Sequence, residues 1–174
     1  MKLITRSKGN TRLASVTYKN TGDLPIETAT ARVWCKTDST QDAEIEALIK
    51  ETVDLAENEF NLTIIDKTVT ATFAEYGEEV SLPFAPVKAI TSAEVDGEAV
   101  EYDLVGDSLL FDTWGGGVLV VTYTTGYTIL PEGLKLAVKK AVLSAFEDRQ
   151  DTVLGGVGMI PNHSRALFKK YRNY

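Results

Sequence analysis

The spacing of apolar residues changes twice along this chain, and those changes constrain the fold more than any other feature. Between residues 38 and 60, apolar side chains recur every three or four positions, as they do on the buried face of an α-helix. From 62 to 124 the period falls to two, in short runs rich in Val, Ile, Thr and aromatic residues, which predicts β-strands. Helical spacing returns from 131 to 150. The pattern predicts an α+β fold, a small antiparallel helical bundle with an inserted antiparallel β-hairpin or β subdomain.

The predicted helices lie on both sides of the strand-rich region. A short helix is expected at 24–37, and a longer one at 38–60 with Ser39 or Thr40 as its N-cap. Another begins near Pro131, because the missing N–H of proline costs nothing in the first turn. Two apolar stripes are expected to pack together: Ile45, Leu48, Ile49, Val53, Ala56 and Phe60 on one helix, and Leu134, Ala137, Val138, Ala141, Val142, Ala145 and Phe146 on the other.

Glycine and proline divide the region 62–124 into separate strands. Asp96-Gly97 between two strand-like runs predicts a tight hairpin, because glycine tolerates the positive φ that such a turn needs. Gly106-Asp107 and the glycines at 115–117 predict further turns. Pro83 and Pro86 are expected to interrupt the ladder of hydrogen bonds. The earliest of the predicted strands is the run Leu-Thr-Ile-Ile at 62–65.

Three segments follow from these boundaries. Residues 1–23 are expected to form a basic N-terminal arm that is extended, mobile or docked on a partner. Residues 24–150 are expected to form one α+β domain, with the β subdomain at about 62–124. Residues 151–174 predict a glycine-containing flexible linker, followed by a helix capped by Asn162 with Leu167 and Tyr171 on one side and a basic face on the other.

Charge is distributed unevenly along the 174 residues, whose net charge is −7. Residues 1–20 carry five bases and no acid, residues 21–130 carry 21 acids against five bases, and residues 131–174 carry eight bases against four acids. The acidic middle argues against a protein that wraps nucleic acid, since affinity for phosphate comes from Lys and Arg. It is compatible with DNA passing nearby, because a negative wall repels DNA and prevents it from sticking.

No group of residues predicts catalysis. His163 is the only histidine and has no partner at nucleophile or ligand spacing, and Cys35, the only cysteine, is expected to be a small core residue. Acids of the 38–60 helix, such as Glu44 and Asp54, lie largely off its apolar stripe and predict a solvated face. Neither glycine-rich run is followed by the Lys-Ser/Thr pair of a phosphate-binding loop. We therefore expect no enzyme, no metal and no cofactor, and no apolar run approaches the roughly 18 residues of a membrane span.

The order of several short motifs carries a family resemblance over residues 24–174. A helix with Asp42, Ile45, Leu48 and Ile49 is followed by Leu-Pro-x-x-Pro-Val, here Leu82, Pro83, Pro86 and Val87. Next come Tyr123, Gly126 and Tyr127, then Pro131 and a helix ending in Phe146, Glu147 and Arg149. The chain closes with the pair Tyr171 and Arg172. In this arrangement it resembles the gp6-like head–tail connector proteins of tailed bacteriophages, also called adaptors or DNA-packaging proteins.

This resemblance implies a structural virion protein of the neck, assembled in the cytoplasm of a bacterial host. It implies a homo-oligomeric ring, dodecameric in the virion, that binds the portal protein and a stopper or tail-completion protein. Double-stranded DNA would pass through the ring without sequence-specific binding, and no membrane would be involved. The resemblance also implies that the C-terminal segment docks on the portal, through Leu167, Phe168, Lys169, Lys170, Tyr171 and Arg172.

Other interpretations remain open at this stage. A ligand- or carbohydrate-binding β module would use the tyrosines and Trp114 beside its three glycines. An enzyme with an acidic catalyst, such as Glu44 or Asp54, would need two carboxylates facing one cleft. Within the neck, the positions of stopper and tail terminator compete with that of adaptor, which the long helices and the C-terminal aromatic-Arg pair favour. Finally, the C-terminal helix is either a docking element or a helix packed on its own core.

Overall fold

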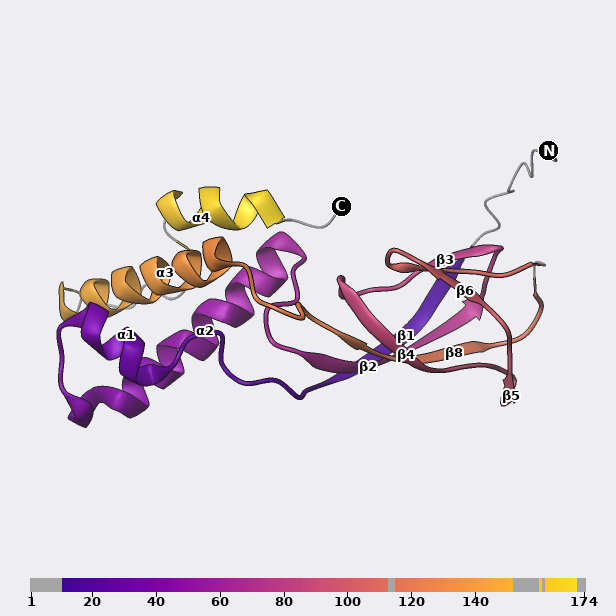
Figure 1. Cartoon of the computed structure of the whole chain (residues 1–174), viewed down its shortest axis with the longest axis horizontal. Coiled ribbons are helices and arrows are strands. Elements are labelled where there is room, and N and C mark those ends of the chain that lie inside the picture. Colours follow the sequence, from indigo (N-terminus) through magenta and orange to yellow (C-terminus); the bar gives the residue numbers. More distant parts are fainter. Residues whose placement is uncertain (1–10, 113–114, 152–159, 161, 172–174) are drawn as a thin grey trace. The chain divides into compact units, whose positions relative to one another are not determined.

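The computed structural model describes residues 11–112, 115–151, 160 and 162–171 (Figure 1). The chain divides into two compact units. The β unit combines residues 1–21 with 66–126, and the helical unit combines residues 22–65 with 127–174. Helices and antiparallel strands are thus segregated, which confirms the α+β class. The region 24–150, expected as one domain with a β subdomain, contributes residues to both units.

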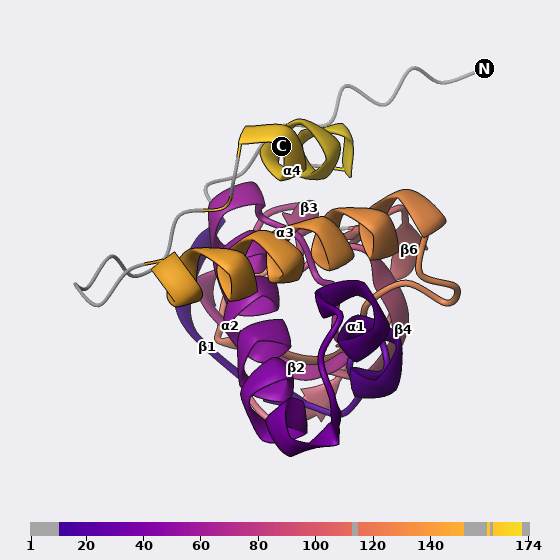
Figure 2. The same cartoon turned by 90° about the vertical axis from the view of Figure 1, so that its left-hand side faces the viewer.

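The helical unit gathers its helices around one apolar core. Figures 1 and 2 show α3 between α4 on one side and α1 and α2 on the other, and α3 contacts all of them. The elements are α1 (Thr28–Cys35), the 3-10 turn η1 (Ser39–Gln41), α2 (Asp42–Phe60), α3 (Glu132–Asp151), α4 (Asn162–Phe168) and the 3-10 turn η2 (Lys169–Tyr171).

Helix α2 carries the central stripe of this core. All six predicted stripe residues are buried, and Thr52 is buried with them. Because α2 is amphipathic, this one face can contact both α1 and α3. The stripe of α3 is buried in the same way except for Ala145, which is half-buried. The predicted packing of the two long helices is therefore confirmed.

The start of α2 differs from the prediction. Asp38, and neither Ser39 nor Thr40, provides the cap: its carboxylate accepts a hydrogen bond from the Thr40 backbone N–H at 2.9 Å. Hydrogen bonds from the side chain and backbone of Thr40 lower the pKa of Asp38. A 3-10 turn precedes the α-helix, so the capping residue moves one position toward the N-terminus. At the other end, Asn61 adopts a left-handed conformation with φ 52° and ends the helix.

The β unit contains a five-stranded and a three-stranded antiparallel sheet. The larger sheet has the order β1-β2-β8-β4-β5 and the smaller one the order β3-β7-β6. The strands are β1 (Arg12–Asn20), β2 (Lys67–Glu75), β3 (Glu79–Ser81), β4 (Val87–Val95), β5 (Glu98–Ala99), β6 (Asp103–Val105), β7 (Ser108–Leu110) and β8 (Leu119–Thr125).

Alternation along the central strands builds the core of this unit. On β2, Val69, Ala71 and Phe73 are buried while the threonines between them are half-buried. Strand β8 repeats the pattern, and its inward residues join the same apolar cluster. On the other face, the hydroxyls of the cross-strand partners Thr70 and Thr122 lie 3.2 Å apart. The period of two therefore marks one apolar and one polar face, as the sequence predicted.

Two expectations about strands are wrong. Residues 12–20 form β1 at the edge of the larger sheet, paired along its length with β2, so this part of the expected arm is a strand. The Tyr18 ring contacts the Phe84 ring edge-on, with 5.1 Å between the ring centres. The ammonium of Lys67 lies 5.5 Å from the centre of the Tyr18 ring. Conversely, residues 62–65 form no strand, because their apolar side chains are buried in the helical core.

The predicted turns at Asp96-Gly97 and Gly106-Asp107 are confirmed. Asp96 and Gly97, with φ of 51° and 89°, connect β4 to β5, and Gly106, with φ of 62°, lies between β6 and β7. Strand β3 ends before Pro83 and β4 begins directly after Pro86, so the prolines interrupt the ladder. The connection expected as a flexible linker after α3 lies largely outside the described residues.

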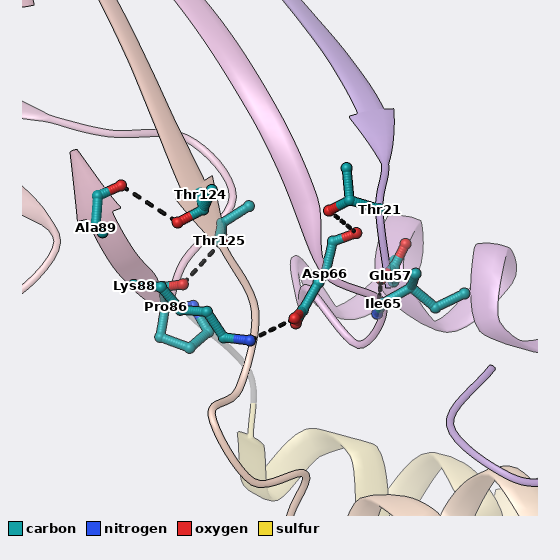
Figure 3. A network of polar contacts seen from close by, with 9 residues as sticks. All are labelled: Thr21, Glu57, Ile65, Asp66, Pro86, Lys88, Ala89, Thr124 and Thr125. Carbon is teal, nitrogen blue, oxygen red and sulfur yellow. Dashed lines mark hydrogen bonds and ion pairs between the residues drawn. The ribbon is translucent and has the colours of Figure 1, made fainter. Parts of the chain in front are cut away.

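Polar contacts of Asp66 hold together the ends of several strands of the β unit (Figure 3). The Asp66 carbonyl accepts hydrogen bonds from the backbone N–H of Thr21 at 2.8 Å and from its hydroxyl at 3.3 Å. The Asp66 carboxylate accepts one from Lys88. Gly126 approaches the same residue so closely that a Cβ at this position would lie 3.1 Å from Asp66 Cα and collide with its carboxylate.

We predict that Gly126→Ala destabilises the protein by roughly 1–3 kcal/mol. The φ of 126° at this position is a conformation that residues with a side chain rarely adopt, and the added methyl has no room beside Asp66. Chemical denaturation measures the change in the free energy of unfolding. The control is Gly116→Ala, where a Cβ meets no atom within 4 Å. Equal stability of the two variants would contradict the close approach at Gly126.

Candidate functional site

The C-terminal segment, for which the family resemblance implies a docking role, is folded as α4 and η2. Phe168 has no exposed surface, and its ring stacks on Phe60 at the end of α2, with 5.5 Å between ring centres. Leu167 is partly buried against the same core. Ile160, ahead of the helix, is also buried. Helix α4 is therefore packed on the core of its own chain, which was one of the two alternatives for this segment.

Two further contacts fix this segment to the rest of the helical unit. Tyr171 packs on the first turn of α3, where a side chain at Gly133 would collide with its hydroxyl. Arg165 forms an ion pair with Glu59 of α2, its Nε donating to Glu59 Oε1 at 2.7 Å. The positions of Phe168, Arg165 and Tyr171 are thus each set by a different contact.

The accessible part of the predicted docking set is basic. Lys169 and Lys170 are exposed, whereas Leu167, Phe168 and Tyr171 are partly or wholly covered by the core. Arg172 lies outside the described residues. The structure therefore separates the five described residues of the predicted docking set into anchors on the core and a charged surface, a division that the sequence did not indicate.

Two of the family motifs meet in the β unit. The turn 82–87 lies against the end of β8, where the Tyr123 hydroxyl donates a hydrogen bond to the Pro83 carbonyl. The Pro86 carbonyl accepts hydrogen bonds from the Thr125 hydroxyl at 2.8 Å and the Gly126 N–H at 2.9 Å. These motif residues act as structural parts that bind one turn to one strand end.

Asp107, which the sequence analysis named only as part of a turn, completes this arrangement. Its carboxylate accepts a hydrogen bond from the Val87 N–H at 2.7 Å, at the point where β4 begins. Burial, and to a smaller extent the charge of Asp107, raise the pKa of Tyr123 above its ordinary value. Tyr123 therefore keeps its proton and remains a hydrogen-bond donor to the turn. Leu82 is buried at the start of the turn.

The remaining motif residues lie in the helical unit. The Pro131 carbonyl accepts hydrogen bonds from the N–H groups of Leu134 at 2.9 Å and Lys135 at 3.1 Å, which starts α3. Tyr127 packs partly buried against the helical core. Glu147 is exposed near the end of α3, and the side chain of Arg149 lies outside the described part.

The described residues offer little for catalysis. No three His, Cys, Asp or Glu side chains in that part of the chain are grouped as a metal site requires. Cys35 is buried, and burial, followed by the charge of Glu147, raises the pKa of its thiol. His163 and Asp54 are exposed. Ten residues of helix separate Glu44 from Asp54, about 15 Å along the axis, so they do not form a carboxylate pair.

Hollows in the β unit do not change this conclusion. One is lined by Tyr76, Tyr102 and Phe111 together with the acidic side chains of Glu101, Asp103 and Asp112. Tyr76 and Phe111 are in edge-to-face contact at 5.1 Å, so these rings pack on each other. Trp114, the residue on which a binding module would depend, lies outside the described residues. Within the described part of the chain, no helix has both the length and the apolar character of a membrane crossing.

Several large apolar side chains are exposed on the helical unit. Ile129, in the segment before α3, is 81% exposed, and Val33 on α1 is 73% exposed. Trp34 and Leu136 are exposed on α1 and α3. Of the residues of α1, only Ala31 and Cys35 are buried, so Val33 and Trp34 lie outside the core. Exposed apolar residues of this kind mark candidate contacts with partners.

Comparison with known proteins identifies the family. The family model described as "Head completion protein" matches residues 26–174. The fold is similar to that of a chain in the structure "Neck of empty GTA particle computed with C6 symmetry", with a TM-score of 0.70 and 19% identity over 91% of this chain and 96% of that one. A chain in "Virion of native gene transfer agent (GTA) particle" gives a TM-score of 0.68, with the same identity and coverage. No curated protein matched the chain.

The match of the family model covers most of the chain. The protein therefore belongs to the head completion protein family. This agrees with the head–tail connector family that the order of motifs indicated, and it makes the protein a structural component of a virion.

We predict that Phe168→Ala destabilises the helical unit by about 3–5 kcal/mol. The substitution removes a fully buried ring and leaves a cavity against Phe60. Thermal and chemical denaturation measure the loss, and Lys169→Ala, at an exposed neighbouring position, is the control. Deletion of 162–174 should also destabilise the fold, whereas a docking tail free of the core would leave stability unchanged in both variants.

We also predict that Cys35 reacts slowly with a thiol reagent at pH 8. Its raised pKa leaves less thiolate at this pH than a free cysteine has, and burial blocks access. The measurement compares the rate of reaction in native protein with the rate in denaturant. A native rate equal to the denatured rate would show an accessible thiol and contradict the core position of Cys35.

Proposed function

We propose that the protein is the adaptor of a virion neck, a ring that binds the portal on one side and a stopper or tail-completion protein on the other. The ring extends the DNA channel and joins head to tail after the genome has been packaged. The observation that carries this proposal is membership of the head completion family over residues 26–174. The fold of the GTA neck chain supports it, because 96% of that chain is covered by the match.

The protein acts without catalysis in this proposal. The buried thiol of Cys35 and the exposed, isolated His163 offer no activated nucleophile or base. A connector needs instead a rigid body with surfaces for its neighbours. The apolar core of the helical unit and the cross-strand core of the β unit supply two such bodies.

The portal-docking surface in this proposal is the exposed end of the C-terminal segment. Phe168 and Leu167 anchor the segment on the core, and Tyr171 fixes η2 on α3. Lys169 and Lys170 then face outward from a preformed helix. Because the segment is already folded, docking does not incur the full entropy of ordering a free tail. The exposed lysines favour an acidic surface on the partner.

DNA would pass this ring without binding to it specifically. Basic residues are few between 21 and 130, and two of them, Lys50 and Lys88, are engaged by Glu46 and Asp66. Acidic side chains dominate the exposed face of α2 and the β4–β5 turn. A surface of this sign repels phosphate and leaves the genome free to slide.

The test is complementation of heads that lack the protein, using the double variant Lys169→Glu with Lys170→Glu. We expect the variant to fold with unchanged stability, because both side chains are exposed, and to reduce the yield of tailed particles at least tenfold. The matched control is Arg12→Glu with Lys19→Glu, which makes the same change of charge on β1. Normal yield from the lysine variant would reject this docking surface, and normal head–tail joining without any of the protein would reject the proposed function.

A further inference from the structure

One exposed face of the helical unit combines apolar and basic side chains. We call it the α1–α3 face and define it by Val33, Trp34, Leu136, Lys139 and Lys140. Residues 136, 139 and 140 lie on one side of α3, because residues three and four apart are neighbours on a helix. The same spacing places the exposed acids Glu132 and Glu147 at the two ends of this stripe, so the lysines form its centre. The ammonium of Lys139 lies 5.6 Å from the centre of the Trp34 ring, which joins the contributions of α1 and α3.

A second exposed face has the opposite charge. We call it the α2 face and define it by Ala47, Glu51, Asp54, Leu55 and Asn58, all of them exposed. Their spacing places them on one side of α2, opposite the stripe that is buried in the core. Leu55 is 36% exposed, so this face also offers an apolar side chain among its charges. Two of these five residues are acids, and the neighbouring base Lys50 is paired with Glu46.

Both faces are available on one copy at the same time. The buried stripe of α2 is packed in the same core as α1 and α3, so its exposed side points away from them. Leu136 and Lys139 lie off the buried residues of α3 and point away from the core as well. Each copy therefore presents one face with lysines at its centre and another with acids at its centre, on different helices.

We propose that the α1–α3 face of one copy binds the α2 face of the next copy. The occupant is a second copy of this chain, because the two faces complement each other in charge and each offers apolar side chains to the other. Pairing of two identical faces is less favourable, because Lys139 and Lys140, or Glu51 and Asp54, would then lie near their equivalents. Since the two faces are different surfaces, a contact between them is head-to-tail, the type that generates rings.

This inference rests on the proposed function, because it names the contact from which the ring is built. It adds a specific consequence: assembly depends on ionic strength, since opposite charges across the contact are screened by salt. It also explains why Trp34 and Leu136 are exposed in a single copy, because a neighbour covers them in the ring.

The experiment uses two full-length variants that each reverse one face. Lys139→Glu with Lys140→Glu makes both faces acidic, and Glu51→Lys with Asp54→Lys makes both faces basic. Light scattering measures the mass of each variant and of the wild type at high protein concentration and low salt. We expect the wild type to form a closed oligomer and each variant alone to have the 19.0 kDa mass of one chain.

Mixing the two variants in equal amounts supplies the decisive result. Acidic and basic faces then alternate between the two kinds of chain, so we expect oligomers to reappear on mixing. Circular dichroism confirms that each variant is folded, and Arg12→Glu with Lys19→Glu is the control that should assemble like the wild type. Unfolded chains would not form oligomers on mixing. The mixing experiment therefore tests the contact even if one variant is less stable than the wild type.

Several outcomes would overturn the proposed contact. These are a variant that keeps the wild-type mass by itself, a mixture that stays at the mass of one chain, and a wild type that stays monomeric under these conditions. None of them rejects the proposed function, because a ring built through other surfaces, or assembled only on a portal, still joins head to tail. The proposed function is rejected by a separate result, namely head–tail joining that proceeds normally without the protein.

Discussion

The buried stripe of α2 is the interaction on which the helical unit depends. Its side chains form one side of a core that α1, α3 and α4 complete. Phe60, the last residue of the stripe, stacks on Phe168 and so connects the end of α2 to the end of the chain. Since α2 has one buried face, its other face is free to be acidic and exposed. The same amphipathic helix thus determines the core, the position of the C-terminal helix and one of the surfaces proposed for assembly.

The β unit depends on a different constraint, the meeting of strand ends at Asp66, Pro86 and Gly126. Hydrogen bonds to the backbone carbonyls of Asp66 and Pro86 join strands that are distant in the sequence. Glycine is required at 126 because Asp66 occupies the space of a side chain. The motifs by which the family is recognised are therefore parts of the scaffold, and the residues that bind partners have to be sought on exposed faces.

The spacing of apolar residues predicted the helices and strands that have one buried face and one exposed face. Helices α2 and α3, the alternating strands β2 and β8 and the turn at Asp96-Gly97 all have local signals that tertiary structure does not override. Residues 62–65 look like a strand because they are apolar and β-branched, but burial in the helical core supplies another reason for that composition. Strand β1 was missed because an edge strand with most side chains exposed has no apolar alternation. Its partners lie more than 45 residues away, beyond what a local pattern can indicate.

The location of the candidate site stays a prediction, and the different roles of its residues could not be predicted from the sequence. Order of motifs pointed to the C-terminal segment, yet a run of apolar and basic residues does not show that Phe168 is buried while Lys169 and Lys170 are exposed. That division depends on Phe60, more than 100 residues earlier in the chain. The faces proposed for assembly were equally hidden, since the exposure of Trp34 and Leu136 follows from the packing of three helices.

The central claim is that the C-terminal helix is folded on the core before it meets any partner. Hydrogen–deuterium exchange of the free protein tests this most directly. The structure predicts that backbone amides of α4 exchange slowly, with protection comparable to that of α2, and that addition of a portal alters exchange chiefly around Lys169 and Lys170. Exchange of α4 at the rate of an unfolded chain in the free protein, with protection appearing only on the portal, would contradict the account.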